Sequence, residues 1–430
     1  MTSHSSSSRN RYYVLAILSL VYVVNVLDRN LIGILVQPIK EEFGVSDSAM
    51  GLLTGFAFVT FYVFAGIPLA RLADRGNRRN ILAAALSIWS VLTALCGLTR
   101  SFLQMAIVRV GVGVGEAAAT PASMSMISDL YSIDRRATAL ALFTAGANVG
   151  TLFALPLGGW INDLYGWRPA FFIVALPGLL LALVVRLTVR EPPRDLLERG
   201  QQIDTKSSLI DTLAHLWRVR SYRHIVLSIG FFIAILYAFY SFGAAFLFRS
   251  HGMSTSESGV WLGLLLGGVT AIGIVIGGVL TDRLQRRDER WNVWLPALAL
   301  SIAAPAAALF VLLPETRAAI FFLGVFSVAG GGIAPASIYA LTQSLVDSRK
   351  RAISAAVMLF TMNFIGGGVG PLLAGMVSDF LNASFGEESL RYGLLAVISL
   401  QFWGIVHLLL AARTIRSDLA RARGKSPAEA

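Results

Sequence analysis

The stretch "YYVLAILSLVYVVNVLDRNLIGILVQPI", residues 12–39, is apolar along nearly its whole length. At about 1.5 Å per residue, a helix of this length is long enough to cross the hydrocarbon core of a bilayer. Its only charged side chains are those of Asp28 and Arg29. Charges at that depth are costly, so a membrane helix that carries both needs a physical reason for them.

Apolar runs of similar length recur through the chain, which has 430 residues, 55% of them hydrophobic and 14% charged. This composition is typical of an all-α polytopic membrane protein and excludes an ordinary soluble domain. We expect twelve spans, at about residues 12–38, 50–73, 80–98, 102–127, 137–161, 169–189, 224–248, 258–281, 292–313, 318–345, 352–378 and 392–412.

The formal net charge is +11, yet nucleic acid is not needed to explain it. Lys and Arg are concentrated in alternate loops, and the positive-inside rule then places both termini in the cytoplasm. The first apolar run lacks a following small-residue cleavage site, so we interpret it as a retained span rather than a signal peptide. We expect a multi-pass protein of the cell (inner) membrane, whose partners include the bilayer but no nucleic acid.

The longest polar segment lies between the sixth and seventh predicted spans. It contains "REPPRDLLERGQQIDTKSSLIDTLAHLWRVRSYRH", in which Leu209, Leu213, Leu216 and Trp217 recur at helical spacing. Part of it is therefore expected to lie along the inner membrane surface. The predicted organisation is a disordered N-terminus at 1–11, six-helix bundles at 12–190 and 223–413, a cytoplasmic connector at 191–222 and a cytoplasmic tail at 414–430.

The two halves resemble each other in sequence. "PASMSMISDLYSIDRRATALALF", which starts at Pro121, returns as "PASIYALTQSLVDSRKRAISAAVMLF", which starts at Pro335. Likewise "ARLADRGNRR" after the second span returns as "GVLTDRLQRR" after the eighth. Matches in the same order along both halves predict a duplicated unit, and hence two pseudo-symmetric six-helix bundles.

Parallel six-span halves and these loops resemble the major facilitator superfamily, with its motif Gly-x-x-x-Asp-Arg-x-Gly-Arg-Arg. This chain has Ala70, Asn77 and Gln285 where the motif has glycine. The resemblance implies alternating access by a monomer. It also implies that Asp74 lies near the start of the eleventh span and Asp282 near the start of the fifth, where both hold the inner gate shut. The implied gating residues are Asp74, Arg75, Arg78, Arg79, Asp282, Arg283, Arg286 and Arg287. Alternatively, these charges only enforce topology.

The fourth predicted span carries two further charges, Arg109 and Glu116. At about 100° per residue, they lie within about 20° of each other on the helix surface. Gly111 and Gly115 lie on roughly the opposite side, where we expect a neighbouring helix to pack closely. No strand precedes these glycines, so a dinucleotide-binding interpretation has no support.

Asp28 and Arg109 are expected at similar depth in the membrane, because the first span runs outward and the fourth runs inward. We therefore predict that they meet in an ion pair. Glu116 is the best candidate for a proton site, since a carboxylate that changes its water access can load and release a proton. The alternative is that these charges and Arg29 merely clamp two helices together. Arg186, near the inner end of the sixth span, is expected to extend to the surface.

"VLDRNL" together with "RVGVGVGEA" resembles the Spinster family, which exports lysolipids and sphingoid phosphates such as sphingosine 1-phosphate. The resemblance implies that Asp28, Arg109 and Glu116 handle substrate and protons, with Asp28 and Glu116 as the proton-coupling pair. Organic-anion and sugar-acid symporters of the same superfamily show a similar pattern. A proton-coupled symporter of small organic anions or sugar acids is thus the alternative function.

The charged residues that lie within predicted spans all belong to the first half of the chain. The spans of the second half contain aromatic and uncharged polar residues instead. A cavity charged on one wall and apolar on the other suits an amphiphile, whereas a sugar acid needs polar partners all round. We therefore expect a lipid-like substrate. The predicted substrate-binding residues are Asn25, Arg29, Arg109, Thr144, Asn148, Tyr237, Tyr240 and Asn363.

A membrane enzyme would need a nucleophile with its base, or a ligand cluster, at membrane depth. The five histidines are scattered, and no metal-ligand spacing is visible. We expect neither a catalytic site nor a metal or cofactor. A gated pore is also disfavoured, because no ring of repeated acidic or carbonyl-bearing loops appears.

Overall fold

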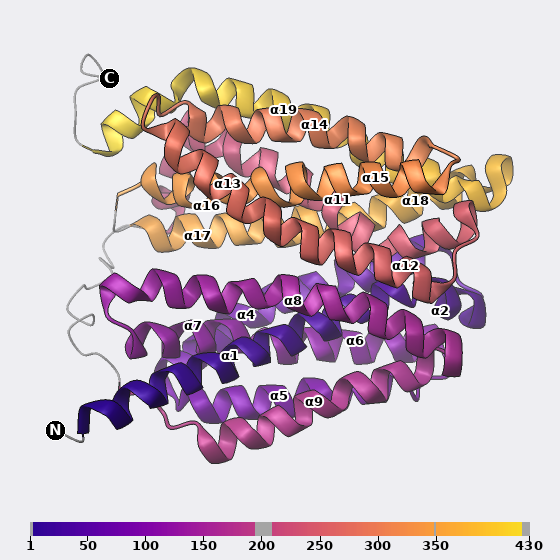
Figure 1. Ribbon diagram of the computed structural model, residues 1–430, viewed down its shortest axis with the longest axis horizontal. Coiled ribbons are helices and arrows are strands. Elements are labelled where there is room, and N and C mark those ends of the chain that lie inside the picture. Colours follow the sequence, from indigo (N-terminus) through magenta and orange to yellow (C-terminus); the bar gives the residue numbers. More distant parts are fainter. Residues whose placement is uncertain (1–2, 194–208, 348–349, 424–430) are drawn as a thin grey trace. The chain divides into compact units, whose positions relative to one another are not determined.

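The computed structural model describes residues 3–193, 209–347 and 350–423 of the chain (Figure 1). Within these ranges the secondary structure is helical and contains no strand. Eleven helical stretches there are long and apolar enough to cross a membrane. The chain is an all-α integral membrane protein, as the composition predicts.

The helices of the first half, in chain order, are α1 (Ser3–Ile34), α2 (Val36–Phe43), α3 (Asp47–Gly51), the π-helix η1 (Leu52–Ala57), α4 (Phe58–Arg75), α5 (Arg78–Cys96), α6 (Phe102–Glu116), α7 (Ala119–Leu130), α8 (Ile133–Tyr165) and α9 (Trp167–Thr188). Those of the second half are α10 (Leu209–Arg218), α11 (Arg220–His251), α12 (Thr255–Leu262), η3 (Gly263–Val269), α13 (Thr270–Gln285), α14 (Trp291–Leu312), α15 (Thr316–Phe326), η4 (Ser327–Ile333), α16 (Pro335–Ser344), α17 (Arg351–Phe360), η6 (Thr361–Val369), α18 (Gly370–Phe385), the 3-10 helix η7 (Gly386–Glu388) and α19 (Ser389–Ala422).

The last of the eleven stretches, Ile353–Ala422, contains two spans rather than one. Gly386 has a φ of 55°, a left-handed conformation that glycine adopts without steric cost. The chain turns back there, so that α18 and α19 pack against each other (Figure 1). Counting them separately confirms the twelve predicted spans.

The two copies of the internal repeat occupy equivalent places in the structure. Pro121 lies in α7, the last part of the fourth span, and Pro335 begins α16, the last part of the tenth. Each copy joins that span to the next one, as predicted. The two segments "DRGNRR" and "DRLQRR" likewise begin within the last turns of α4 and α13.

Contacts divide the described residues into two compact units. Unit 1 consists of residues 3–193 with Tyr240–Phe248 and Gly252–Gly267, and unit 2 of the remaining described residues. Unit 1 thus contains the predicted N-terminal bundle together with α12. The domain limits at 190/191 and 222/223 stay a prediction, because contacts group residues of the second half with unit 1.

The core of unit 1 lies between α1, α5, α7 and α8, where Leu86, Trp89 and Phe143 are fully buried. The close packing of α5 on α6 depends on glycine. A Cβ atom added to Gly115 would lie 2.9 Å from Cβ of Trp89, and one added to Gly111 would lie 3.0 Å from a methyl of Leu92. The predicted packing role of this glycine pair is confirmed.

A row of glycines also joins α12 and η3 to α8 within unit 1. Cβ atoms added to Gly259 and Gly263 would lie 2.3 Å from the carbonyl oxygen of Leu155 and 2.7 Å from Pro156. Beyond the glycines, Nδ2 of Asn162 donates to Oγ1 of Thr255 at 3.0 Å. The backbones of the two helices therefore approach to a distance that no larger side chain allows.

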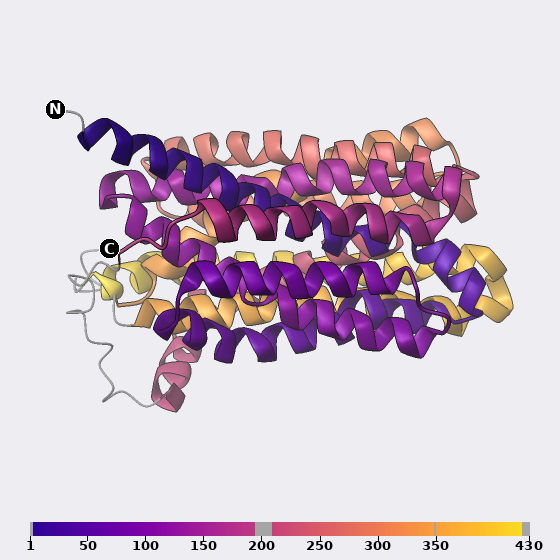
Figure 2. The ribbon, with the colours of Figure 1, turned by 90° about the horizontal axis from the view of Figure 1, so that it is seen from below.

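The ends of the chain and the connector differ in part from the sequence-based expectation. Helix α1 begins at Ser3, so most of the segment expected to be disordered is helical. The expected amphipathic helix in the connector is α10, which contacts α17. Its axis makes a large angle with the axes of the long helices of unit 2 (Figure 2). Its Ile210 and Trp217 are exposed while Leu216 is buried. Residues 194–208 of the predicted connector lie outside the described ranges.

Candidate functional site

Two ion pairs connect α1 to α6 in the interior of unit 1. Nη2 of Arg29 lies 2.9 Å from Oε2 of Glu116, and Nη1 of Arg109 lies 3.2 Å from Oδ1 of Asp28. Asp28 and Arg109 are each 2% exposed, and Glu116 is fully buried, whereas the side chain of Arg29 is 19% exposed. The predicted pairing of Asp28 with Arg109 is confirmed, and Arg29 forms a second pair.

The local sequence explains why two pairs form rather than one. Adjacent residues on a helix point about 100° apart, so the side chains of Asp28 and Arg29 leave α1 in different directions and reach different residues of α6. Residues seven positions apart on α6 lie on one line, about two turns from each other. The long arginine side chains extend along the helix axes to span this two-turn separation, so that each carboxylate pairs with one guanidinium group.

Two neighbouring spans complete this cluster with residues that were not predicted from the sequence. The hydroxyl of Thr93, on α5, donates to Oδ2 of Asp28. The ring of Phe58, on α4, has its centroid 5.2 Å from the guanidinium carbon of Arg29 and 5.3 Å from that of Arg109. One aromatic face thus stabilises both cations through its quadrupole. Nothing in the sequence marks which face of these uncharged stretches turns inward.

Several buried polar atoms of the cluster keep unused hydrogen-bonding capacity. Within the described residues, Oε1 of Glu116, Nε of Arg109 and Nδ2 of Asn25 have no hydrogen-bond partner. Buried polar atoms without partners are costly and need an explanation in a native structure. The acceptor on Glu116 could receive a proton, and this acceptor and the donors on Arg109 and Asn25 could each bind a water molecule or a polar group of a substrate.

The other predicted substrate residues are distributed over both units. On α8, Thr144 is exposed and donates to the carbonyl of Ala141 at 3.1 Å, and Asn148 is half-buried. Tyr240 belongs to unit 1. Its carbonyl oxygen would lie 1.9 Å from a Cβ atom added to Gly33.

Unit 2 contains the remaining two predicted substrate residues. Tyr237 is half-buried on α11, and Asn363 lies in η6, where its Nδ2 donates to the carbonyl of Leu359 at 2.8 Å. The structure therefore brings the four charged residues together within unit 1, and Tyr237 and Asn363 remain candidates in unit 2.

The loop after α4 forms a second buried charge cluster, centred on Arg78. This side chain is 2% exposed and pairs with Asp129 of α7 and with Glu191, whose Oε1 lies 2.8 Å from Nε. The other carboxylate oxygen of Glu191 accepts from the backbone N–H of Arg79 at 2.8 Å. Asn77, which departs from the motif glycine, caps α5 through the N–H of Asn80.

The predicted gating residues therefore differ in their surroundings. Arg78 is held by contacts inside unit 1, Arg75 is exposed, and the side chain of Asp74 is outside those that the structure describes. In the second copy of the motif, Asp282 is exposed and accepts from Gln285 Nε2 at 3.3 Å. Arg283, Arg286 and Arg287 are exposed as well. The gating role of both loops stays a prediction.

Unit 2 has its own charge contacts outside the spans, and these were not predicted. Asp288, in the loop after α13, accepts from Nη2 of Arg416 at 2.6 Å, and Glu289 pairs with Arg423 at 2.5 Å. The N–H of Arg290 and the guanidinium of Arg416 lower the pKa of the Asp288 carboxyl. These pairs join the loop to the end of α19.

Two histidines of unit 2 also meet. Nδ1 of His224 on α11 lies 2.8 Å from Nδ1 of His407 on α19, so one ring donates and the other accepts. This pair was not predicted, because the two residues are 183 positions apart in the chain.

The model of the Major Facilitator Superfamily matches residues 18–419 of the chain. An MFS-type efflux pump of Mycolicibacterium smegmatis is 34% identical over 416 residues, which cover 96% of this chain and 95% of that protein. The sphingosine-1-phosphate transporter SPNS2 of Danio rerio is 27% identical, with 87% of this chain and 77% of that protein covered. A hexuronate transporter of Bacillus subtilis is 23% identical, with 91% and 94% covered.

Among solved structures, the chain is similar to a bacterial homolog of the human lysosomal transporter Spinster, crystallised in an inward-facing and unoccupied conformation. The TM-score is 0.84 at 32% sequence identity, and the alignment covers 95% of this chain and 98% of the other. The match extends over both halves of the chain. The chain therefore belongs to the major facilitator superfamily of transporters, within which it resembles the Spinster proteins.

Proposed function

We propose that this protein is a proton-coupled secondary transporter that moves an amphiphilic, lipid-like molecule such as a lysophospholipid or a sphingoid compound across the membrane. It acts as a monomer in the cell (inner) membrane with both termini in the cytoplasm, and it catalyses no chemical reaction. The observation that carries the proposal is the buried pair of Arg29 and Glu116 beside the pair of Asp28 and Arg109.

The coupling of proton binding to anion binding follows from the geometry of the first pair. When Glu116 binds a proton it becomes neutral, and Arg29 loses its counter-ion while it remains in a low-dielectric site. An anionic head group that approaches Arg29 then replaces the carboxylate. Proton binding and anion binding thus favour each other, which is the requirement for coupled transport.

The two arginines have different parts in this mechanism. Arg109 is 2% exposed and faces Asp28, whereas the side chain of Arg29 is 19% exposed. Both arginines are among the predicted substrate-binding residues, and Arg29 is the more accessible cation of the two. Arg109 then serves mainly to keep Asp28 ionised and in position, with the hydroxyl of Thr93 as the second partner of that carboxylate.

The amphiphilic substrate is supported by the distribution of charge and by the relatives. Within the six spans predicted for the second half there is no Asp, Glu, Lys or Arg. Apolar surface there suits an acyl chain. The similarity to Spinster proteins and to a sphingosine-1-phosphate transporter agrees with this. The hexuronate transporter among the relatives keeps a small sugar acid as the alternative substrate.

Transport into sealed proteoliposomes tests the function. We expect a pH gradient to drive accumulation of a fluorescent lysophospholipid by the wild type. Glu116→Gln keeps the shape of the side chain but cannot release a proton, so it should bind the lipid and lose gradient-driven accumulation. Glu41→Gln, at an exposed residue paired with Gln37, is the matched control. Equal gradient-driven transport by Glu116→Gln and wild type would rule out the coupling site.

A chain-length series separates the two substrate classes. Each additional buried methylene should tighten binding of an amphiphile by about 0.8 kcal/mol, or roughly fourfold, until the pocket is filled. Tight binding of a hexuronate, without any dependence on acyl length among lysophospholipids, would transfer the assignment to sugar acids.

A further inference from the structure

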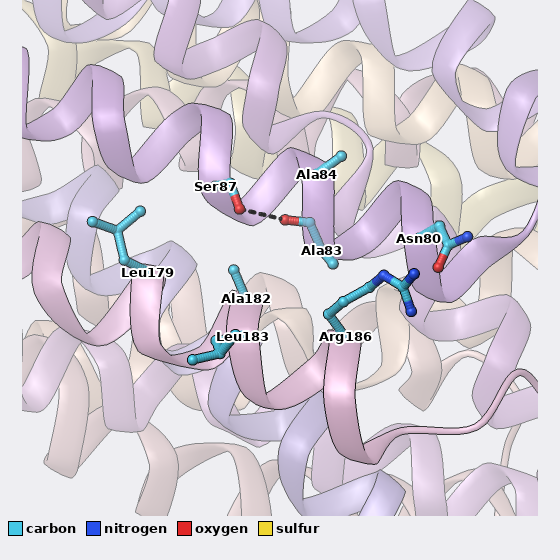
Figure 3. Close-up of a pocket in the computed structure, with 8 residues that line it drawn as sticks. All are labelled: Asn80, Ala83, Ala84, Ser87, Leu179, Ala182, Leu183 and Arg186. Carbon is cyan, nitrogen blue, oxygen red and sulfur yellow. Dashed lines mark hydrogen bonds between the residues drawn. The ribbon is translucent and has the colours of Figure 1, made fainter.

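A groove on unit 1 runs between α5 and α9, away from the charged cluster (Figure 3). It is open on one side and has a volume of about 440 Å³. Both helices line it with residues three or four positions apart, so each presents a single face. The groove is hollow because three of its lining residues are alanines, Ala83, Ala84 and Ala182, whose small side chains leave the space between the two helices unfilled.

The two ends of the groove differ in chemistry. Figure 3 shows Arg186 and Asn80 at one end and Leu179 at the other. Leu179 is 36% exposed and Leu183 57% exposed, so the wall between them is an accessible apolar strip. The polar end coincides with the start of α5 at Arg78 and the end of α9 at Thr188. It therefore lies at the boundary of the membrane, and the apolar end lies at hydrocarbon depth.

The polar end of the groove is lined by the hydrogen-bond donors of Arg186 and Asn80. The nearby carboxylate of Glu191 bonds to Arg78 and to the backbone N–H of Arg79. Arg186 is exposed and makes no hydrogen bond or ion pair within the described residues. Oδ1 of Asn80 accepts from Nε of Arg79 at 3.1 Å, which leaves the amide N–H groups of Asn80 as donors. No Asp or Glu lines the groove. The guanidinium of Arg186 and the amide of Asn80 are thus available to an anion with several acceptor oxygens, and Arg79 lies next to them through its bond to Asn80.

We propose that this groove binds an anionic glycerophospholipid of the surrounding bilayer. Its phosphate lies against Arg186 and Asn80, with Arg79 beside them, and one acyl chain follows Leu179 and Leu183. Solvation of Arg186 by water alone would not account for the groove beside it or for the accessible apolar strip of Leu179 and Leu183. Because no Asp or Glu lines the groove beside Arg186, a head group with a net negative charge is preferred over a zwitterionic one. This lipid is a bound component of the membrane, distinct from the transported molecule.

Native mass spectrometry of the purified full-length protein tests the proposal. The protein is released from detergent after incubation with phosphatidylglycerol or with phosphatidylcholine of the same acyl chains. We expect one phosphatidylglycerol to be retained more strongly than phosphatidylcholine. Arg186→Gln should weaken retention of phosphatidylglycerol about fivefold, the contribution of one arginine near an anionic lipid, and remove the head-group preference.

Two further variants make the result specific to the groove. Ala84→Phe fills the hollow from an exposed position and keeps both arginines, so it should also lose the lipid. Arg190→Gln removes an exposed arginine that does not line the groove, and it should bind as the wild type does. Equal retention of phosphatidylglycerol by wild type, Arg186→Gln and Ala84→Phe would overturn the proposal. An equal loss in Arg190→Gln would overturn it too, since the attraction would then be general surface charge.

Discussion

Nη2 of Arg29 lies 2.9 Å from Oε2 of Glu116, although the two residues are 87 positions apart in the chain. Asp28 pairs with Arg109 as well, so two salt bridges join the first span to the fourth. In one of them the first span supplies the base, and in the other it supplies the acid. Each helix supplies one acid and one base. Removal of any one member leaves an uncompensated charge in the interior, which gives the cluster clear mutational signatures.

The first prediction concerns the stability of this cluster. Arg29→Ala should destabilise the protein by about 3 kcal/mol, because it leaves Glu116 buried without a cation. The double variant Arg29→Ala with Glu116→Gln should recover much of that loss, since no unpaired charge remains. Thermal unfolding in detergent measures both. If the double variant is no more stable than Arg29→Ala, the buried charge is not the source of the effect.

A second prediction concerns Phe58, whose ring faces both Arg29 and Arg109. Phe58→Leu should lower the unfolding free energy by about 1 kcal/mol through the two cation–π contacts, in addition to lost packing. Phe58→Tyr keeps the ring and should retain the cation–π part. Phe64, on the same helix, is 65% exposed and offers the matched control Phe64→Leu. A similar loss in the control would show that the effect is not specific to the cluster.

The glycine row on α12 leads to the third prediction. Gly259→Ala would place a methyl group 2.3 Å from the carbonyl oxygen of Leu155, so α12 and α8 have to separate. A cost of about 1–3 kcal/mol is expected for such overpacking. Gly278, on α13, has nothing within 4 Å of an added Cβ atom. Gly278→Ala should therefore be neutral or slightly stabilising, as alanine favours helix. Equal melting temperatures for the two variants would contradict the close contact.

Acid sensitivity of the loop after α13 is the fourth prediction. The N–H of Arg290 and the guanidinium of Arg416 lower the pKa of Asp288 in the folded protein. The stabilisation is therefore complete above the unfolded pKa of about 4 and is lost as the pH falls through the folded value. The variant Asp288→Asn has no carboxylate at this position and therefore lacks this pH-dependent stabilisation at every pH. Its melting temperature should be below that of the wild type at neutral pH, and the difference should shrink as the pH falls through the lowered pKa of Asp288.

The extent to which the sequence predicted this structure varies with the kind of contact. Span positions follow from apolar runs, and the meeting of Asp28 with Arg109 follows from counting depth in two antiparallel helices. The contacts of Thr93 and Phe58 could not be predicted, because both lie on stretches without charges that would identify the inward face. Arg78 finds Glu191 at a separation of 113 residues, beyond any local pattern.

The π-helical segments limited the prediction in another way. A π-helix has more residues per turn than an α-helix, so side chains beyond it point in directions that a count of 100° per residue does not give. The segments η1, η3, η4 and η6 interrupt four different spans of the described chain. Asn363 lies within η6, so its direction was not accessible to a helical projection.

The pairing of two acids with two bases also has an electrical consequence. With all four side chains ionised, the cluster of Asp28, Arg29, Arg109 and Glu116 has no net charge, and the membrane potential does no work on it during a conformational change. One bound proton makes it a monocation, and one bound monoanion returns it to neutrality. An empty carrier and a carrier loaded with one proton and one monoanion should then cycle at rates insensitive to voltage, whereas a carrier with only a proton should respond to it.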